Sequence, residues 1–210
     1  REYIARKYDL GSELMLRPTE IDLSNMNIDK IEEHAFTGLD FIETLVLDYN
    51  NITELGPNLF IDLKSLSQLS IAQNRLKSIQ SNAFKGLSSL EKLILTENNI
   101  EYIDENAFKD LSILKTLSLA ENKLKWLNPN WFRGLTDLNG LNVSTNRIKD
   151  IDLGTFKYTP NIVLLDMSGN YLSKISTHMF RDLERLTLLY VSNNRISEIE
   201  KGSFVNNFDL

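Results

Sequence analysis

The sequence predicts an α/β repeat solenoid: a right-handed coil with a parallel β-sheet on its concave face and irregular or short helical segments on its convex face. Three observations support this prediction. The chain repeats a pattern of 24 residues, with no insertion or deletion from Pro18 to Asp209. Part of each unit alternates apolar and polar residues, as a half-buried strand does. Each unit is too short to bury its own apolar side chains, so neighbouring units must stack.

Positions in the repeat are numbered 1 to 24, starting at Pro18. The eight predicted repeats span 18–41, 42–65, 66–89, 90–113, 114–137, 138–161, 162–185 and 186–209. We expect residues 1–17 to form an N-terminal lead-in or a cap without disulfides, because the chain has no cysteine. Leu210 falls at position 1 of a ninth repeat, so we expect the array to be truncated there.

The apolar positions predict where the core lies. Positions 4 and 6 are aliphatic or Met and open the predicted strand, and positions 11 and 14 are aliphatic throughout. Position 19 is always phenylalanine: Phe36, Phe60, Phe84, Phe108, Phe132, Phe156, Phe180 and Phe204. We expect these rings to fill the interior on the side opposite the sheet.

Position 9 is asparagine in seven of the eight repeats: Asn50, Asn74, Asn98, Asn122, Asn146, Asn170 and Asn194. Here the chain leaves the sheet, and its buried backbone groups need new partners. An asparagine amide both donates and accepts hydrogen bonds, so it can bridge its own turn and that of the next repeat. Met26 replaces it in the first repeat, so either a flanking asparagine substitutes or the first turn is looser.

The unit L-x-x-L-x-L-x-x-N-x-I-x-x-I-x-x-x-A-F-x-G-L, with tails such as "NAFKGL" at 82–87 and "NWFRGL" at 130–135, resembles the typical 24-residue leucine-rich repeat of extracellular proteins. Toll-like receptors, Slit, chaoptin-like adhesion proteins and secreted insect immune proteins share it. The resemblance implies a horseshoe that recognises proteins, in the secretory pathway or at the cell surface. Members of this family usually have cysteine-rich caps, and this chain departs from the family because it has no cysteine. An intracellular scaffold protein is therefore another interpretation of the sequence.

Composition and spacing argue against catalysis. His34 and His178 would lie about 29 Å apart, six strand steps of ~4.8 Å, so they cannot share a metal or a nucleophile. We expect no catalytic residue, no cofactor and no metal. The formal net charge of −6 also argues against a general nucleic-acid-binding protein.

Two surfaces are candidate binding sites. The first is the concave face, where exposed apolar residues predict contact with a protein ligand or co-receptor, or with repeats beyond this chain; its residues are Val163, Leu164, Asp166, Leu188 and Tyr190, with Val46 and Tyr49. The second, the flank stripe, occupies positions 10 and 12 and could meet a sulfated glycan or another anionic partner, or only solvent; it comprises Arg75, Lys77, Lys123, Lys125, Arg147, Lys149 and Arg195.

Asn51 and Asn142 begin sequons for N-glycosylation, and Asn51 should be accessible, whereas Asn142 should project from the concave sheet. The resemblance to Toll-like and secreted immune proteins implies an ectodomain fragment of an innate immune or signalling protein. The alternative is an adhesion or matrix protein that acts through homophilic or lateral contacts, including a homodimer. Attachment to a membrane would require segments outside this chain.

Overall fold

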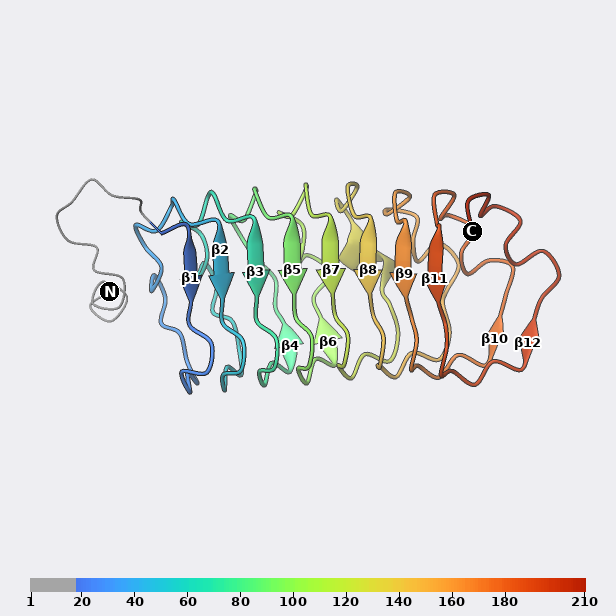
Figure 1. Ribbon diagram of the computed structural model, residues 1–210, viewed down its shortest axis with the longest axis horizontal. Helices are drawn as coiled ribbons and strands as arrows, with labels where there is room; N and C mark the ends of the chain where they lie inside the picture. The colour runs from blue at the N-terminus through green and yellow to red at the C-terminus, as the bar shows by residue number, and fades with distance from the viewer. Residues whose placement is uncertain (1–17) are drawn as a thin grey trace.

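Eight short parallel strands form one sheet along the coil in the computed structural model, which describes residues 18–210 (Figure 1). Each strand pairs with its neighbour at an offset of 24 residues, as Ile21 does with Leu45, because the repeats have equal length. The predicted leucine-rich solenoid is confirmed. In spatial order the strands are β1 (Glu20–Asp22), β2 (Thr44–Val46), β3 (Gln68–Ser70), β5 (Lys92–Ile94), β7 (Thr116–Ser118), β8 (Gly140–Asn142), β9 (Leu164–Asp166) and β11 (Leu188–Tyr190).

The other elements are small. Two-residue strands form pairs beside the main sheet: β4 (Ser78–Ile79) with β6 (Tyr102–Ile103), and β10 (Lys174–Ile175) with β12 (Glu198–Ile199). The 3-10 helix η1 (Pro129–Phe132) is the only helix within residues 18–210. The Asn128 side chain caps it by accepting the Asn130 amide hydrogen at 2.9 Å. The helical content is therefore lower than the α/β label implies.

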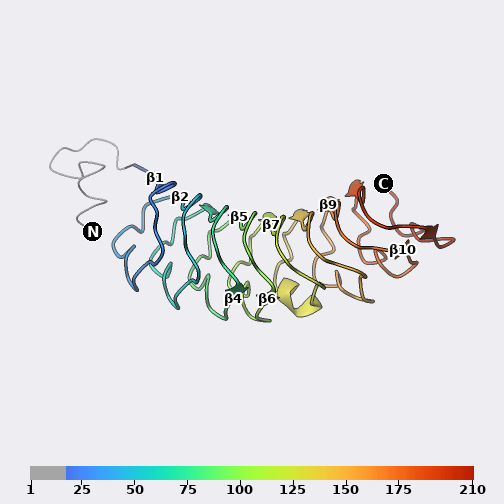
Figure 2. The same cartoon turned by 90° about the horizontal axis from the view of Figure 1, so that it is seen from below.

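The coil bends, with the sheet on its inner side (Figure 2). The phenylalanine column explains the direction of the bend. Adjacent rings that stack in this column have centroids 5.8 to 6.3 Å apart, whereas neighbouring strands lie about 4.8 Å apart. Because the bulky rings hold the repeats further apart on their side, the opposite, sheet side becomes concave.

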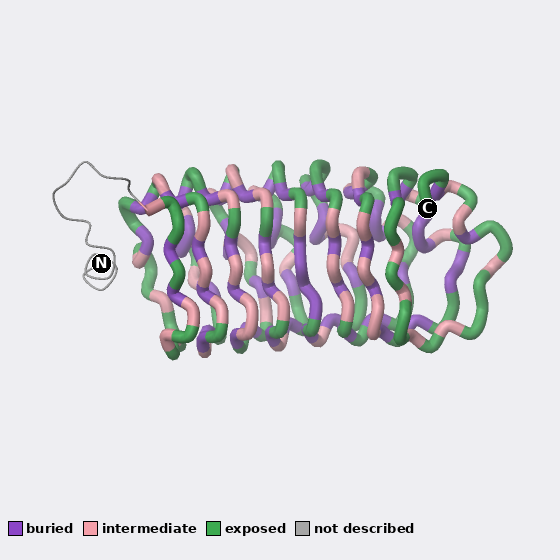
Figure 3. The backbone as a smooth tube through the Cα atoms, in the orientation of Figure 1, coloured by how far each residue is buried: buried purple, intermediate pink, exposed green. Residues whose placement is uncertain are grey.

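Burial is periodic along the coil (Figure 3). Within each strand the middle residue points into the core, and seven of the eight are buried, while the flanking residues are mostly half-buried or exposed. The last repeat is less enclosed, because repeat 7 covers only one side of it. Leu189 is half-buried and Ile199 is 60% exposed.

The asparagines of position 9 form a continuous ladder of hydrogen bonds. The Asn74 Oδ1 accepts the Ile52 amide hydrogen at 3.0 Å, and its Nδ2 donates to the Leu47 carbonyl at 2.9 Å. Both partners lie in the preceding repeat, not in the following one, so the expected direction of the bridge was wrong. Six of the seven asparagines are buried, and Asn194 is half-buried.

This direction explains why the first repeat tolerates Met26. The Asn50 Oδ1 accepts the amide hydrogens of both Met26 and Ile28, each at 3.0 Å. The first turn is therefore served by the asparagine of the second repeat, and no asparagine is required at its own position 9. The expected N-terminal cap, residues 1–17, lies outside the described residues.

Candidate interaction surfaces

Strands β9 and β11 bring the C-terminal concave residues together. Leu164 pairs with Leu188, and Asp166 pairs with Tyr190. Leu188 is 44% and Tyr190 is 48% exposed, while Leu164 is half-buried because β11 lies beside it. Alternation along a strand directs these side chains out of the sheet, away from the core. Together with Val163, which is also exposed, they form an apolar area that we call the concave patch.

Asp166 occupies a defined orientation within the concave patch. Its Oδ1 accepts hydrogen bonds from the Ser168 amide at 2.9 Å and from the Ser168 hydroxyl at 2.6 Å. The carboxylate is half-buried, and Oδ1 is occupied by Ser168. The patch therefore combines exposed apolar side chains with one carboxylate whose orientation is set by Ser168.

Val46 and Tyr49 do not join the concave patch. Val46 lies on β2, five strands from β9 in the sheet order, which corresponds to roughly 24 Å at ~4.8 Å per step. Val46 is half-buried, whereas Tyr49 is 54% exposed and has a left-handed φ of 56°. The two residues and the C-terminal ones lie near opposite ends of the sheet, so Val46 and Tyr49 stay a separate prediction of partner binding.

The flank stripe is interrupted. Asn99 and Glu101 occupy positions 10 and 12 of repeat 4, and the Arg195 guanidinium lies 4.5 Å from the centre of the Tyr171 ring. Lys123 is half-buried, and the other six cations are exposed. The continuous part of the stripe is therefore limited to repeats 5 and 6, and comprises Lys123, Lys125, Arg147 and Lys149.

Sequence reasoning missed a second row of cations on the convex face. Position 20 directly follows the phenylalanine column and is basic in five consecutive repeats. All five side chains are exposed. The same position-by-position reading that found the phenylalanines would have found this position-20 row: Lys85, Lys109, Arg133, Lys157 and Arg181.

The two sequon asparagines differ in their surroundings. Asn142 ends β8, is half-buried, and accepts the Ser144 amide hydrogen at 2.9 Å. Asn51 lies outside the main sheet, but it is also half-buried, so it is less accessible than expected. The backbone N–H of Asn51 donates to the Ile28 carbonyl at 2.7 Å.

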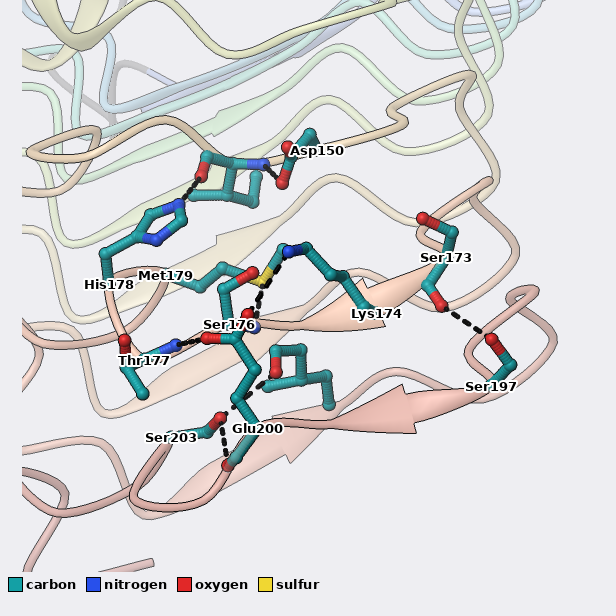
Figure 4. Close-up of polar contacts among 12 residues, drawn as sticks. Asp150, Ser173, Lys174, Ser176, Thr177, His178, Met179, Ser197, Glu200 and Ser203 are labelled. Carbon is teal, nitrogen blue, oxygen red and sulfur yellow. Dashed lines mark hydrogen bonds and ion pairs between the residues drawn. The ribbon is translucent and has the colours of Figure 1, made fainter.

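A polar cluster joins the last three repeats on the flank (Figure 4). The Glu200 carboxylate accepts the Thr177 amide hydrogen at 3.0 Å and lies 3.2 Å from the Lys174 ammonium. These two contacts, led by the Thr177 amide, lower the pKa of Glu200, and Glu200 in turn raises the pKa of Lys174. The His178 ring lies 3.1 Å from the Ile151 carbonyl. Because each contact joins neighbouring repeats, we interpret the cluster as structural.

A leucine rich repeat family model matches residues 19–76, 64–114, 89–148 and 136–196, which together cover most of the chain. The chain belongs to the leucine-rich repeat family. No curated protein matches it.

Two solved structures are similar to this leucine-rich repeat chain. The Toll–Spatzle complex of Drosophila matches with a TM-score of 0.85 and 26% identity, over 91% of this chain and 26% of that one. The TLR13–ssRNA13 complex matches with a TM-score of 0.75 and 28% identity, over 84% of this chain and 28% of that one. The chain thus spans about a quarter of the length of each. The repeats and this likeness suggest a protein-binding module of an extracellular or cell-surface protein.

No group of three or more His, Cys, Asp or Glu side chains within residues 18–210 is arranged to hold a metal ion. No helix in the same residues is long and apolar enough to cross a membrane.

Proposed function

We propose that this leucine-rich repeat array is the recognition module of an extracellular or cell-surface protein in innate immune or developmental signalling. In this proposal the concave patch binds a protein ligand or co-receptor. The observation that carries the proposal is the pairing of β9 with β11, which aligns Leu164 with Leu188 and leaves Tyr190 exposed beside them. Tyrosine and adjoining apolar side chains are common anchors in protein interfaces.

Rigid presentation supports this function. Seven asparagines and eight phenylalanines repeat along the coil, and the concave side chains project from hydrogen-bonded strands. Because the surface is already formed, binding orders few additional groups, and less entropy is lost. A protein ligand can therefore be held by a small number of anchors.

A protein partner suits the concave face better than a nucleic acid. In the first five repeats this face carries Glu20, Glu43, Glu91, Glu97 and Glu121, and Lys115 is paired with Glu91 at 2.9 Å. These carboxylates would repel phosphates. The two similar structures contain different ligands, Spatzle with Toll and ssRNA13 with TLR13. The acidic concave face therefore favours a protein ligand, such as Spatzle in the Toll complex, over a nucleic acid.

The test measures binding of the purified, labelled chain to intact cells of the organism that encodes it. We expect saturable binding that is lost when trypsin removes cell-surface proteins. Leu188→Ala with Tyr190→Ala should weaken the affinity at least tenfold, equivalent to about 1.4 kcal/mol. Leu153→Ala is the matched control, because Leu153 is apolar and 65% exposed but lies outside the sheet. Equal affinities of the double variant and the parent would eliminate the concave patch as the site.

A further inference from the structure

The position-20 row, defined above, is an unbroken line of five cations along the convex face. Beneath the row, the Phe84 and Phe108 rings have centroids 5.8 Å apart and the Phe132 and Phe156 rings 6.2 Å apart, so the cations that directly follow these rings recur at about that interval. The five cations thus extend over roughly 24 Å along the coil, four steps of about 6 Å at the position-19 spacing. The backbone of each repeat fixes this interval, so the charges cannot move apart to reduce their repulsion.

Within residues 18–210, no side chain of the row forms an ion pair with a carboxylate. The ion pairs within residues 18–210 are Glu33–His34, Glu91–Lys115 and Glu200–Lys174, and none involves a residue of the row. Asp110 and Asp182 follow Lys109 and Arg181 in sequence, and Asp104 is also near Lys109. At the centre of the row, however, Gly134 and Tyr158 occupy the position that follows each cation. In the middle of the row, the position directly after each cation therefore adds no negative charge.

Side chains at the centre of the row are already oriented. The Arg133 guanidinium donates to the Asn130 Oδ1 at 3.4 Å and to the Tyr158 hydroxyl at 3.5 Å. The Lys157 ammonium lies 4.8 Å from the centre of the Tyr158 ring. The hydrogen bond from Arg133, with the nearby Lys157, lowers the pKa of the Tyr158 phenol. Tyr158 thus gathers two cations of neighbouring repeats around one polar group.

The shape of the surface restricts the partner. The convex face is curved (Figure 2), so a flat membrane would meet only part of the row, whereas a flexible linear polymer could follow all of it. Binding of single-stranded nucleic acid combines positive charge with aromatic rings that are free to stack on bases. Tyr158 is the only aromatic residue at positions 20 and 21 in the five repeats, and its ring is occupied by Arg133 and Lys157.

We infer that the position-20 row binds a sulfated polysaccharide that lies along the convex face. Sulfate groups stay ionised, they recur along the polymer, and they accept the hydrogen bonds that guanidinium and ammonium groups donate. This site lies on the opposite side of the coil from the concave patch. A protein ligand and a polysaccharide could therefore bind at the same time.

The test titrates a fluorescent heparin-derived dodecasaccharide with the purified chain at about 0.15 M salt, where surface charges remain effective over ~8 Å. The triple variant Lys109→Ser, Arg133→Ser, Lys157→Ser should lose at least tenfold in affinity. The matched control removes the same charge from the flank stripe, with Lys125→Ser, Arg147→Ser, Lys149→Ser, and should change the affinity less than threefold. All six side chains are exposed, and unchanged melting temperatures would show that both variants are folded.

Four outcomes would overturn the inference. One is no saturable binding by the parent chain. Another is an equal loss in both triple variants, because overall charge would then explain binding. The others are a loss confined to the flank-stripe variant, and tighter binding of polyglutamate or of a single-stranded RNA than of the dodecasaccharide. A tenfold loss confined to the position-20 variant, with weaker binding of the other two polymers, supports it.

Discussion

Asn122 and Ile100 lie in successive repeats, and the Asn122 Oδ1 accepts the Ile100 amide hydrogen at 2.9 Å. The Nδ2 of the same side chain donates to the carbonyls of Leu95, Leu119 and Ala120 at 2.9, 3.2 and 3.0 Å. One buried amide group thus satisfies backbone atoms of two repeats. The ladder lets the turn after each strand be buried without unpaired polar groups.

Asn122→Ala should destabilise the fold by roughly 1–3 kcal/mol, because backbone groups of two repeats would remain buried without partners. Asn106→Ala is the control, since Asn106 is exposed and its side chain makes no hydrogen bond within the described residues. Urea denaturation measures both changes. Equal midpoints for the two variants would contradict the structural role of this asparagine.

Gly86→Ala should be destabilising by about 1–3 kcal/mol, within the range for steric and backbone strain. Gly86 has φ +89°, and an added Cβ would lie 2.9 Å from the Ile61 carbonyl oxygen. Gly56→Ala is the control, because nothing lies within 4 Å of its Cβ and its φ is not in the left-handed region. Thermal melts should show a lower midpoint only for Gly86→Ala. A similar decrease for both would indicate that the close contact with Ile61 is unimportant.

Phe108→Ala should cost about 3–5 kcal/mol, the usual range for truncating a buried ring. Phe108 is fully buried and stacks on Phe84 at 5.8 Å. Phe204→Ala should cost less, because Phe204 is only half-buried, although each of the two rings stacks on one neighbour. The free energies of unfolding from urea titrations test this order. If Phe204→Ala is the more damaging change, the burial of the ring does not determine the effect.

Acid should loosen the contact between repeats 7 and 8. The pKa of Glu200 is lowered in the folded state, so its stabilising contribution is present above its unfolded pKa, about 4.3, and is lost as the pH falls from there through the folded value. Lys174 behaves oppositely, because its raised pKa means that its contribution is lost only at alkaline pH. Both groups are solvent-screened, so the effect is small.

Hydrogen exchange of the Thr177 amide, which donates to Glu200, provides the measurement. Its protection factor should fall in the parent as the pH drops below the ordinary Glu pKa of about 4.3 and Glu200 becomes protonated. In Glu200→Gln it should be lower at neutral pH and should change little with acid. Glu198→Gln should behave like the parent, because Glu198 is only a minor influence on Lys174. A parent protection factor that is constant down to pH 3 would contradict this role of Glu200.

Peptide mass spectrometry of protein from its native source should find a glycan at Asn51 more often than at Asn142. Asn142 ends β8, and its side-chain oxygen is engaged by the Ser144 amide. A glycan at either site would establish passage through the secretory pathway. Full occupancy at Asn142 would cover the middle of the concave face, and the proposed protein ligand would then have to bind closer to β11.

The sequence by itself determined the architecture, because 24-residue units of equal length must stack in register and bury the same positions each time. The phenylalanine column and the asparagine positions could be assigned to this architecture before any coordinates. The pairing of Leu164 with Leu188 followed from the same arithmetic. These features depend on spacing alone.

The tertiary structure decided the direction of the asparagine hydrogen bonds and which side chains of neighbouring repeats come into contact. The asparagines bond to the preceding repeat, which a repeating pattern read along one chain does not distinguish from the following one. Burial of Asn51 and the distance of Tyr49 from the concave patch depend on how whole repeats pack and bend. The same packing brings Arg133 to Tyr158, because side chains 25 residues apart in sequence become neighbours only when the repeats stack.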